Sequence, residues 1–215
     1  MTTPDIPGLL AIWVRGWAAS RDCAPPAADG AGWRVEVGAH EQRRRHVFAG
    51  DAARLRELAE TEHTPWVWLK ACLRNEPLGA LLPPRWRLTP TLSWFMRHDG
   101  APPRDTPLPA GYSLDIAIEG AVHHARLHAA DGTLAADGRV LLVDGHAIFD
   151  RIGTHEAHRR RGLGRALMRA LHDRANDLDA TCGLLVATEA GHALYRTLGW
   201  DALSPYAGAV IPGDA

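Results

Sequence analysis

The sequence predicts a mixed α/β fold in which a twisted, mostly antiparallel sheet is flanked by helices. Two observations in the second half of the chain predict it. Residues 112–154 contain short alternating segments separated by Asp-Gly pairs, a pattern typical of antiparallel strands. From residue 146 onward, apolar strand-like segments alternate with segments of helical periodicity, which gives the order β-α-β-α-β.

The antiparallel part begins at residue 112. We expect strands at residues 112–119, 122–130, 133–136, 140–143 and 146–154. Asp131-Gly132 predicts a hairpin turn and Asp144-Gly145 a further turn, because glycine adopts positive φ at no steric cost.

The helices follow. Residues 162–171 form an amphipathic helix with apolar side chains on one face, at Leu163, Ala166, Leu167, Ala170 and Leu171. A buried strand at 182–187, a helix at 190–198 ended by Gly199, and a closing strand at 207–211 complete the order.

The N-terminal half is atypical. Alternation predicts a strand pair within residues 32–48, and Leu55, Leu58 and Ala59 predict a helix at 52–62 with Asp51 as its N-cap. Residues 65–73 are expected to form a buried strand, and residues 76–82 a short helix.

A domain boundary is predicted near residue 105. Residues 100–111 hold four prolines, and proline fixes φ and removes an amide donor. Seven of the eight tryptophans precede this connector. We therefore divide the chain into a Trp-rich region at 1–105 and a second region at 106–215.

Composition limits the partners and the compartment. With 24 basic and 25 acidic residues the net charge is −1, which predicts binding to neither nucleic acid nor membrane. Three widely spaced cysteines suit a reducing cytoplasm. The start of the chain lacks the basic segment of a secretion signal, and the apolar run at 8–14 is too short to span a bilayer. The excess of Ala, Gly, Pro and Arg is bacterial-like and is attributed to codon usage.

The most informative segment lies between the strand ending near Thr154 and the helix starting at Gly162. Early helix amides lack partners within the helix, and the helix dipole adds positive potential there. Glycines let an anion approach the backbone, and arginines add charge-assisted hydrogen bonds. The segment predicts a phosphate-bearing ligand; the alternative is a loosened helix start beside a solvated arginine run.

The spacing Arg159-x-x-Gly162-x-Gly164 resembles the coenzyme A signature of the GCN5-related N-acetyltransferase (GNAT) superfamily. A second segment, Ala193-Leu194-Tyr195 followed by Gly199-Trp200, is similar to a later motif of the same family. The resemblance covers residues 112–211, about half of the chain. It implies a GNAT-like sheet, with the N-terminal half either completing it or forming a degenerate second copy that shapes the acceptor side.

The resemblance also implies roles for particular residues. Acetyl-CoA is the expected co-substrate. Its diphosphate is expected at the amides of residues 161–165 with Arg159 helping to position it, and its pantetheine arm along a strand that splays from residues 182–187. The candidate cofactor-binding residues are Ile152, Gly153, Thr154, Arg159, Arg160, Arg161, Gly162, Leu163, Gly164 and Arg165.

Tyr195 matches the tyrosine that protonates the departing thiolate; the alternative is an aromatic side chain that only packs. His146, Ile148, Asp150 and Ile152 share a strand face at period two. For the general base, the resemblance makes Asp150 the first choice, because many members of the family carry an acidic residue at this distance before Arg159; His146 is the second choice. Asp150 as a partner of an arginine is the competing interpretation. Thr188 departs from the family, which often has asparagine there.

The predicted function is direct transfer of an acetyl group from acetyl-CoA to a primary amine of a small molecule. The alternatives are acetylation of a protein or an aminoacyl-tRNA, and a non-catalytic module that binds CoA and regulates. No metal is predicted, because His155 and His158 are three residues apart, not four. The sequence is compatible with a homodimer. Tryptophans 66, 68 and 94, with Phe95, are candidate walls of an acceptor pocket.

Overall fold

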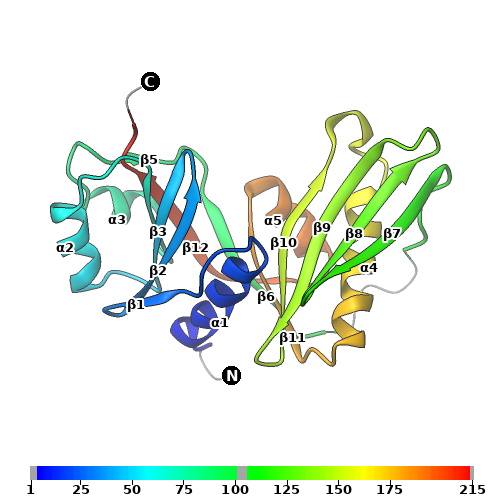
Figure 1. Cartoon of the computed structure of the whole chain (residues 1–215), viewed down its shortest axis with the longest axis horizontal. Helices are drawn as coiled ribbons and strands as arrows, with labels where there is room; N and C mark the ends of the chain where they lie inside the picture. Colours follow the sequence, from blue (N-terminus) through cyan, green and yellow to red (C-terminus); the bar gives the residue numbers. More distant parts are fainter. Residues whose placement is uncertain (1–3, 101–105, 214–215) are drawn as a thin grey trace. The chain divides into compact units, whose positions relative to one another are not determined.

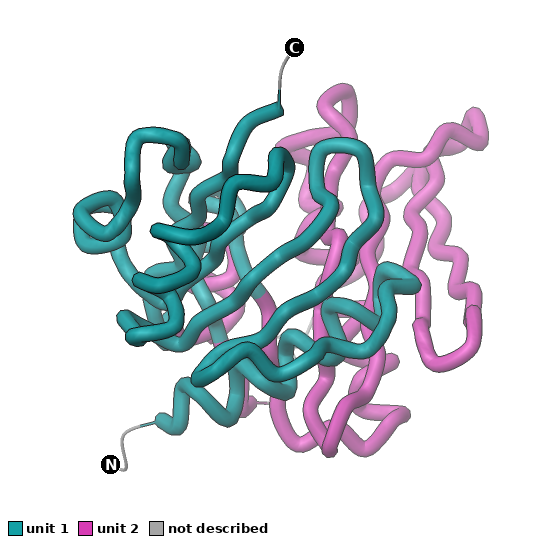
Figure 2. The backbone as a smooth tube through the Cα atoms, turned by 60° about the vertical axis from the view of Figure 1, so that its left-hand side comes forward, with its two compact units in different colours: residues 1–96, 186–192, 202–215 teal, residues 97–185, 193–201 magenta. Residues whose placement is uncertain are grey.

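The computed structural model describes residues 4–100 and 106–213. The chain divides into two compact units, drawn in teal and magenta in Figure 2. Unit 1 comprises residues 1–96, 186–192 and 202–215, and unit 2 comprises residues 97–185 and 193–201. Each unit is described by itself. No helix in the described ranges is both long and apolar enough to cross a membrane.

Unit 2 is built on the antiparallel strands that the sequence predicts. They are β7 (Tyr112–Glu119), β8 (Val122–Ala129), β9 (Leu134–Val143) and β10 (His146–Thr154), and β11 (Cys182–Ala187) pairs with β10 in parallel. The expected turns are present, with positive φ at Gly132 and Gly145. The bounds of β7, β10 and β11 agree with the prediction.

Strand β9 differs from the prediction, because residues 134–143 form one strand where two were expected. Asp137 and Gly138 pair with β8 and do not turn away. Glycine fits at 138 for a packing reason: a Cβ there would lie 2.9 Å from Cδ1 of Leu171 and 3.2 Å from Cγ1 of Ile152.

Helix α4 (Leu163–Asp177) covers one face of this sheet, in contact with β8, β9 and β10 (Figure 1). Its apolar face is the predicted one. The helix runs six residues further than predicted, where Ala175 is still buried and Arg174 pairs with Asp177. Helix α5 (Glu189–Thr197) ends before Gly199, which has a φ of 86°.

The strands of unit 1 are hydrogen-bonded in the order β1-β2-β3-β4-β12-β6, with β5 paired to β12. The strands are β1 (Ala27–Asp29), β2 (Gly32–Ala39), β3 (Gln42–Phe48), β4 (Val67–Ala71), β5 (Arg87–Leu88), β6 (Ser93–His98) and β12 (Asp201–Val210). Helices α2 (Ala53–Thr61) and α3 (Asn75–Gly79) belong to this unit, and Leu55 and Leu58 of α2 pack with Phe48 and Leu69 in one buried cluster.

Helix α1 (Ile6–Ala19) was not predicted. Asp5 caps it by accepting a hydrogen bond from the Gly8 amide at 3.1 Å, and the helix buries Leu10, Trp13 and Trp17. The capping role expected of Asp51 is wrong: Ala52 occupies the N-cap of α2, and Asp51 forms an ion pair with Arg56.

Two further differences concern unit 1. Strand β12 begins at Asp201, six residues earlier than expected, and pairs with β4, so the two units do not follow a single cut near residue 105. Residues 101–105 of the predicted connector lie outside the described residues.

Phe95 is fully buried against Trp13, so the prediction that it lines an acceptor pocket is wrong: the side chain belongs to the core.

The two units repeat one order of elements. Unit 1 contains β2-β3-α2-β4-α3, in which β3 and β4 are parallel neighbours joined through α2. The chain then contains β9-β10-α4-β11-α5, in which β10 and β11 are parallel neighbours joined through α4.

Candidate functional site

The connection from β10 to α4 forms an exposed loop with an unusual backbone. It consists of a 3₁₀ turn at Glu156–His158 followed by Arg159 to Gly162. Arg160 and Gly162 both have positive φ, at 60° and 82°, and Arg161 between them does not. Alternation of this kind turns successive N–H groups to one side and makes a concave anion-binding nest.

The amides of this loop are available. Within the part of the chain that the structure describes, the N–H groups of residues 160–164 donate to no other group. The Arg165 amide was expected to bind the ligand, and here the prediction is wrong, because this N–H donates to the Gly162 carbonyl at 3.1 Å as the helix begins. Five consecutive amides, from 160 to 164, remain for an anion.

Three arginines of the loop are held by hydrogen bonds. Nε of Arg159 donates to the Thr154 carbonyl at 3.4 Å, Arg161 donates to the Tyr112 hydroxyl at 3.1 Å, and Arg165 donates to Oγ1 of Thr197 at 3.2 Å. Residues 159–162 are exposed, so an anion can reach them. The side chain of Leu163 is buried, and only its amide can take part in binding.

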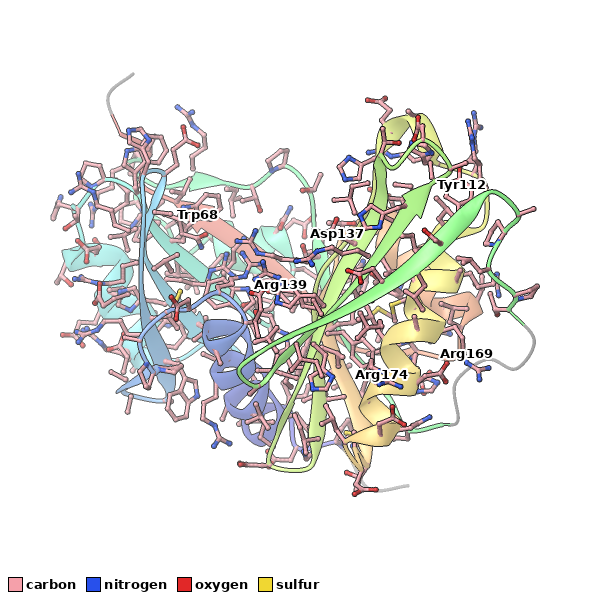
Figure 3. All side chains as sticks on the ribbon, turned by 45° about the vertical axis from the view of Figure 1, so that its right-hand side comes forward. Trp68, Tyr112, Asp137, Arg139, Arg169 and Arg174 are labelled. Atoms are coloured by element: carbon pink, nitrogen blue, oxygen red, sulfur yellow. The ribbon has the colours of Figure 1, made fainter. Side chains whose placement is uncertain are left out.

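Tyr112 is a residue of this site that the sequence did not reveal. It starts β7, and its hydroxyl lies 3.0 Å from Nδ1 of His158 as well as 3.1 Å from Nη1 of Arg161 (Figure 3). The ring also packs edge-on against the His158 ring, with 5.8 Å between centroids. One phenol therefore holds both ends of the segment 158–161. Only the pairing of strands brings residue 112 here, so no local motif could have identified it.

The two glycines have different tasks. Gly162 has a left-handed conformation, and a Cβ there would come no closer to another residue than 3.7 Å, from Cγ of Pro109, which suits the close approach of an anion. At Gly164 a Cβ would lie 3.1 Å from Cδ2 of Leu194, so glycine there lets α5 pack against the first turn of α4. Together with the Arg165–Thr197 hydrogen bond, this contact fixes Tyr195 of α5 near the loop.

Tyr195 is buried, with 6% of its surface exposed, and its ring lies 6.0 Å from that of Trp200. Burial raises the pKa of its phenol above the usual value, so the group is a protonated donor throughout the neutral range. Within residues 106–213 and 4–100, its hydroxyl has no hydrogen-bond partner. A buried donor without a partner can serve an incoming acceptor.

Strand β10 contains a bulge that the sequence pattern did not predict. The register shifts between Asp150, which pairs with Arg139, and Gly153, which pairs with Asp137, so Arg151 and Ile152 oppose the single residue Gly138. Arg151 has a φ of 52°. The expected shared face of residues 146–152 therefore holds only as far as Asp150, because the extra residue turns Ile152 toward Gly138 and α4.

The parallel pairing of β10 with β11 covers only His146–Ile148 and Cys182–Leu184. Phe149 and Leu185, the next residues along each strand, are not paired. This end of the pairing agrees with the splay that the resemblance implies.

The two candidate bases lie at different distances from the loop. Asp150 is partly buried and directly opposite Arg139, which is labelled on β9 in Figure 3. His146 starts the strand, and its Nδ1 lies 2.7 Å from the Asp144 carbonyl, which can only accept; Nδ1 is thus the protonated nitrogen and Nε2 the basic one. Asp150 lies four residues and His146 eight residues before Thr154 along β10, so Asp150 is the nearer of the two to the loop.

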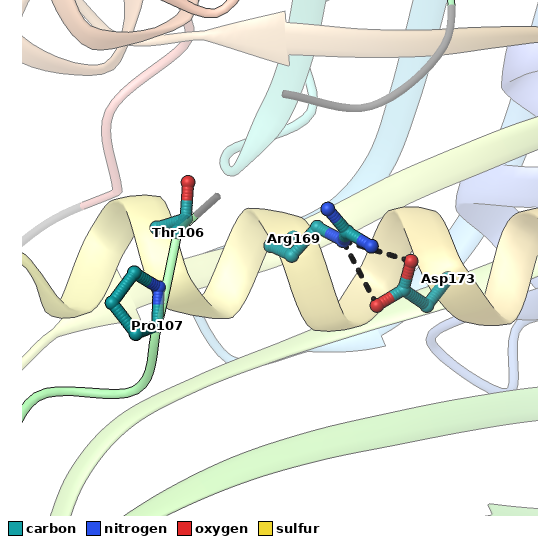
Figure 4. A pocket seen from close by; sticks show the side chains of 4 residues that line it. All are labelled: Thr106, Pro107, Arg169 and Asp173. Carbon is teal, nitrogen blue, oxygen red and sulfur yellow. Dashed lines mark hydrogen bonds and ion pairs between the residues drawn. The ribbon is translucent and has the colours of Figure 1, made fainter. Parts of the chain in front are cut away.

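Thr188 has a structural task. Its Oγ1 accepts a hydrogen bond from the Gly191 amide at 3.2 Å, and its carbonyl accepts from the His192 amide at 2.7 Å, so it caps α5. A separate, open pocket on α4 is lined by Thr106, Pro107, Arg169 and Asp173 (Figure 4). It shares no residue with the loop, and its Arg169 and Asp173 pair with each other at 2.9 Å.

Comparison with known proteins connects this geometry to one family. Residues 122–202 match the family model described as an acetyltransferase (GNAT) domain. A search of curated proteins found no match.

Solved structures resemble the whole chain. A GCN5-related N-acetyltransferase from Kribbella flavida is 15% identical, with 99% of this chain and 98% of that one covered at a TM-score of 0.67. An acetyltransferase of the GNAT family from Novosphingobium aromaticivorans is 17% identical, with 95% and 97% covered at 0.60. A GCN5-related N-acetyltransferase from Sphaerobacter thermophilus is 13% identical, with 100% and 98% covered at 0.60. At these identities the likeness shows the fold.

Proposed function

We propose that this chain, whose residues 122–202 match the acetyltransferase (GNAT) domain model, is a member of the GNAT superfamily and transfers the acetyl group of acetyl-CoA to a primary amine of a small molecule. The family and the fold support acyltransferase activity. The observation that carries the finer proposal is the row of five unpaired amides at residues 160–164 among the described residues, placed beside four arginines at the start of α4.

These amides suit the diphosphate of acetyl-CoA. An anion at a helix N-terminus gains hydrogen bonds from unpaired N–H groups and favourable interaction with the helix dipole. The pantetheine arm then runs along Thr154, Gly153 and Ile152. The thioester lies at the bulge formed by Arg151 and Ile152, where main-chain groups of β10 leave the regular strand pairing with β9.

The chemistry needs one base and one acid. The amine loses a proton to Asp150, directly or through water, and its nitrogen attacks the thioester carbonyl carbon. The C–S bond breaks, and Tyr195 gives its proton to the departing sulfur. The second proton of the amine nitrogen then passes through water to the Tyr195 phenolate, so that the products are an acetamide and free CoA and the phenol is restored. We prefer Asp150 to His146, because His146 lies about 13 Å further along β10 than Asp150 does.

We propose that unit 1 is a degenerate copy of the same motif, which shapes the acceptor side and binds no second cofactor. The repeated element order supports the common origin. The loop equivalent to residues 159–162 runs from Ala49 to Ala52 in unit 1. It carries no arginine, and its Asp51 would repel a diphosphate.

The experiment is a screen of primary amines, amino acids, aminoglycosides, a basic protein and an aminoacyl-tRNA, read as free thiol released from acetyl-CoA. We expect turnover with at least one small amine. Turnover only with the basic protein or only with the aminoacyl-tRNA would show that this macromolecule is the class of acceptor. Binding of CoA without turnover on any member would favour a regulatory module.

Replacing Tyr112 with phenylalanine should weaken CoA binding about tenfold and leave kcat unchanged. The substitution removes the hydroxyl that holds Arg161 and His158 but keeps the ring contact with His158, and a hydrogen bond to a charged group contributes roughly 1.5–3 kcal/mol. The measurement is the Kd for CoA together with KM and kcat. Ser113→Ala, an exposed change one residue away, is the matched control. An unchanged Kd would show that Tyr112 does not position the loop.

A further inference from the structure

Lys70 is the only lysine of the chain, and it lies on strand β4 of unit 1. Strand β4 alternates: Val67, Leu69 and Ala71 are buried in the cluster beneath α2, whereas Trp68 and Lys70 project from the opposite face of the sheet. Lys70 is partly buried, neither withdrawn from solvent nor freely exposed.

Its side chain lies in a space that a glycine leaves open. Gly208 of β12 pairs directly with Lys70, and a Cβ at 208 would lie 2.8 Å from Cδ and 2.9 Å from Cε of the lysine. On the other side, Nζ lies 4.8 Å from the ring centroid of Trp68, a residue labelled in Figure 3. The backbone of β12 therefore replaces part of the water that normally surrounds an ammonium group, while the face of the Trp68 ring attracts the ammonium.

The neighbouring charge has the same sign. Arg45 of β3 pairs in register with Trp68, and its guanidinium lies 4.0 Å from a Trp17 ring centroid. Within the ranges that the structure describes, no carboxylate forms an ion pair with Lys70. The other titratable groups on this face, Cys72 and Tyr206, both have pKa values raised by burial, so they are neutral and supply no negative charge at neutral pH.

The partial burial of Lys70 and the neighbouring Arg45 charge both disfavour the charged form of the lysine. Burial first, and the Arg45 guanidinium second, lower the pKa of Lys70 to about 7. A partly desolvated lysine next to another cation is the arrangement that turns this side chain into a nucleophile.

We propose that Lys70 is an acyl-acceptor site, whose side-chain amine attacks acyl thioesters and becomes N-acylated. The Nζ lone pair forms a bond to the carbonyl carbon and the C–S bond breaks. The amine proton passes through water to the departing thiolate, so that the products are an amide at Lys70 and a free thiol. The inference depends on the proposed function only where acetyl-CoA is the thioester supplied.

The test uses the full chain and two thioesters, acetyl-CoA and S-acetyl-N-acetylcysteamine, which has no nucleotide. Each is incubated with the protein from pH 6 to pH 10, and peptide mass spectrometry reads acetylation at residue 70 separately from the α-amino group. We expect the Lys70 rate at pH 7.5 to exceed that of a lysine amide by at least about tenfold, with a midpoint near pH 7.

Two variants and one state serve as controls. Lys70→Arg should lose the label. Arg45→Gln removes the like charge and should move the midpoint to higher pH, with tryptophan fluorescence confirming that the variant is folded. The same chain in denaturant should show the profile of an ordinary lysine, with a midpoint near pH 10.4.

Three results would overturn the proposal: a midpoint near pH 10 in the folded protein, a rate at pH 7.5 no higher than that of the lysine amide, or labelling only in denaturant. The small thioester separates this outcome from that of the proposed function. Labelling of Lys70 by it, with no turnover on the amine panel, would leave the acyl-acceptor site standing while the acetyltransferase proposal fails. Turnover on the amine panel without labelling of Lys70 would leave the acetyltransferase proposal standing while the acyl-acceptor proposal fails.

Discussion

Replacing Tyr195 with phenylalanine should lower kcat by about 10²-fold or more, with the Kd for CoA changed by no more than about twofold. A positioned general acid contributes roughly 10²–10⁴-fold to a rate. The substitution removes only the hydroxyl, because the phenylalanine ring can keep the packing of Tyr195 against Trp200. Burial keeps the native phenol protonated by raising its pKa, so the donor is present throughout the neutral range.

The measurement pairs thiol release, for kcat, with calorimetric titration of CoA, for Kd. Tyr206→Phe is a matched control: Tyr206 is also buried, has a raised pKa and a hydroxyl without a partner among the described residues, but belongs to unit 1. Full kcat in Tyr195→Phe would assign the residue to packing alone. A fall in both variants would indicate a general effect of losing a buried hydroxyl.

The second large effect is a loss of stability in acid, centred on His172. This side chain of α4 is 4% exposed, and Nε2 is buried without a partner. The His98 and Phe149 rings lie 4.8 Å away and that of Trp200 5.7 Å away. Burial, then His98 and Arg169, lower the pKa of His172 to about 3.

The direction in which the free energy of unfolding changes with pH follows from whether the folded or the unfolded state binds the proton. The unfolded chain takes up a proton at His172 near pH 6.5, whereas the folded chain resists it until about pH 3. The free energy of unfolding therefore falls as pH decreases from 6.5 toward 3, by about 1.4 kcal/mol per pH unit from this group, or on the order of 5 kcal/mol in all. Above pH 6.5 this contribution is constant.

Urea unfolding at pH 7, 6, 5 and 4 measures the slope. His172→Leu, which keeps an apolar side chain of similar size, should flatten it by about 1.4 kcal/mol per unit. Some slope should remain, because burial also lowers the pKa values of His46 and His98. The same slope in the native protein and in His172→Leu would refute the assignment to this residue.

The strands and helices of unit 2 could be predicted because their signals are local. Alternation determines β7 and β10, and glycine with positive φ marks the turns and the end of α5. The loop was found for the same reason, since unpaired amides at a helix start follow from chain order alone. The sequence also predicted the β2-β3 pair and the helix α2.

What the sequence did not reveal depends on partners far along the chain. Tyr112 reaches the loop only because β7 is placed beside it by sheet pairing. The bulge at Arg151 arises where two residues face the single Gly138, and period-two reasoning assumes that no such insertion occurs. Strand β12 starts early because β4 is its partner, and Asp51 leaves the helix cap because Arg56 is within reach.

The most direct test of the account is an NMR titration that follows the backbone amides as CoA is added to the full chain. We predict that the largest shifts fall on residues 160–164, where the amides are unpaired, and that the amides of 49–53 in the equivalent loop of unit 1 do not move. Binding of CoA with no shift at 160–164 would contradict the claim that this loop holds the diphosphate.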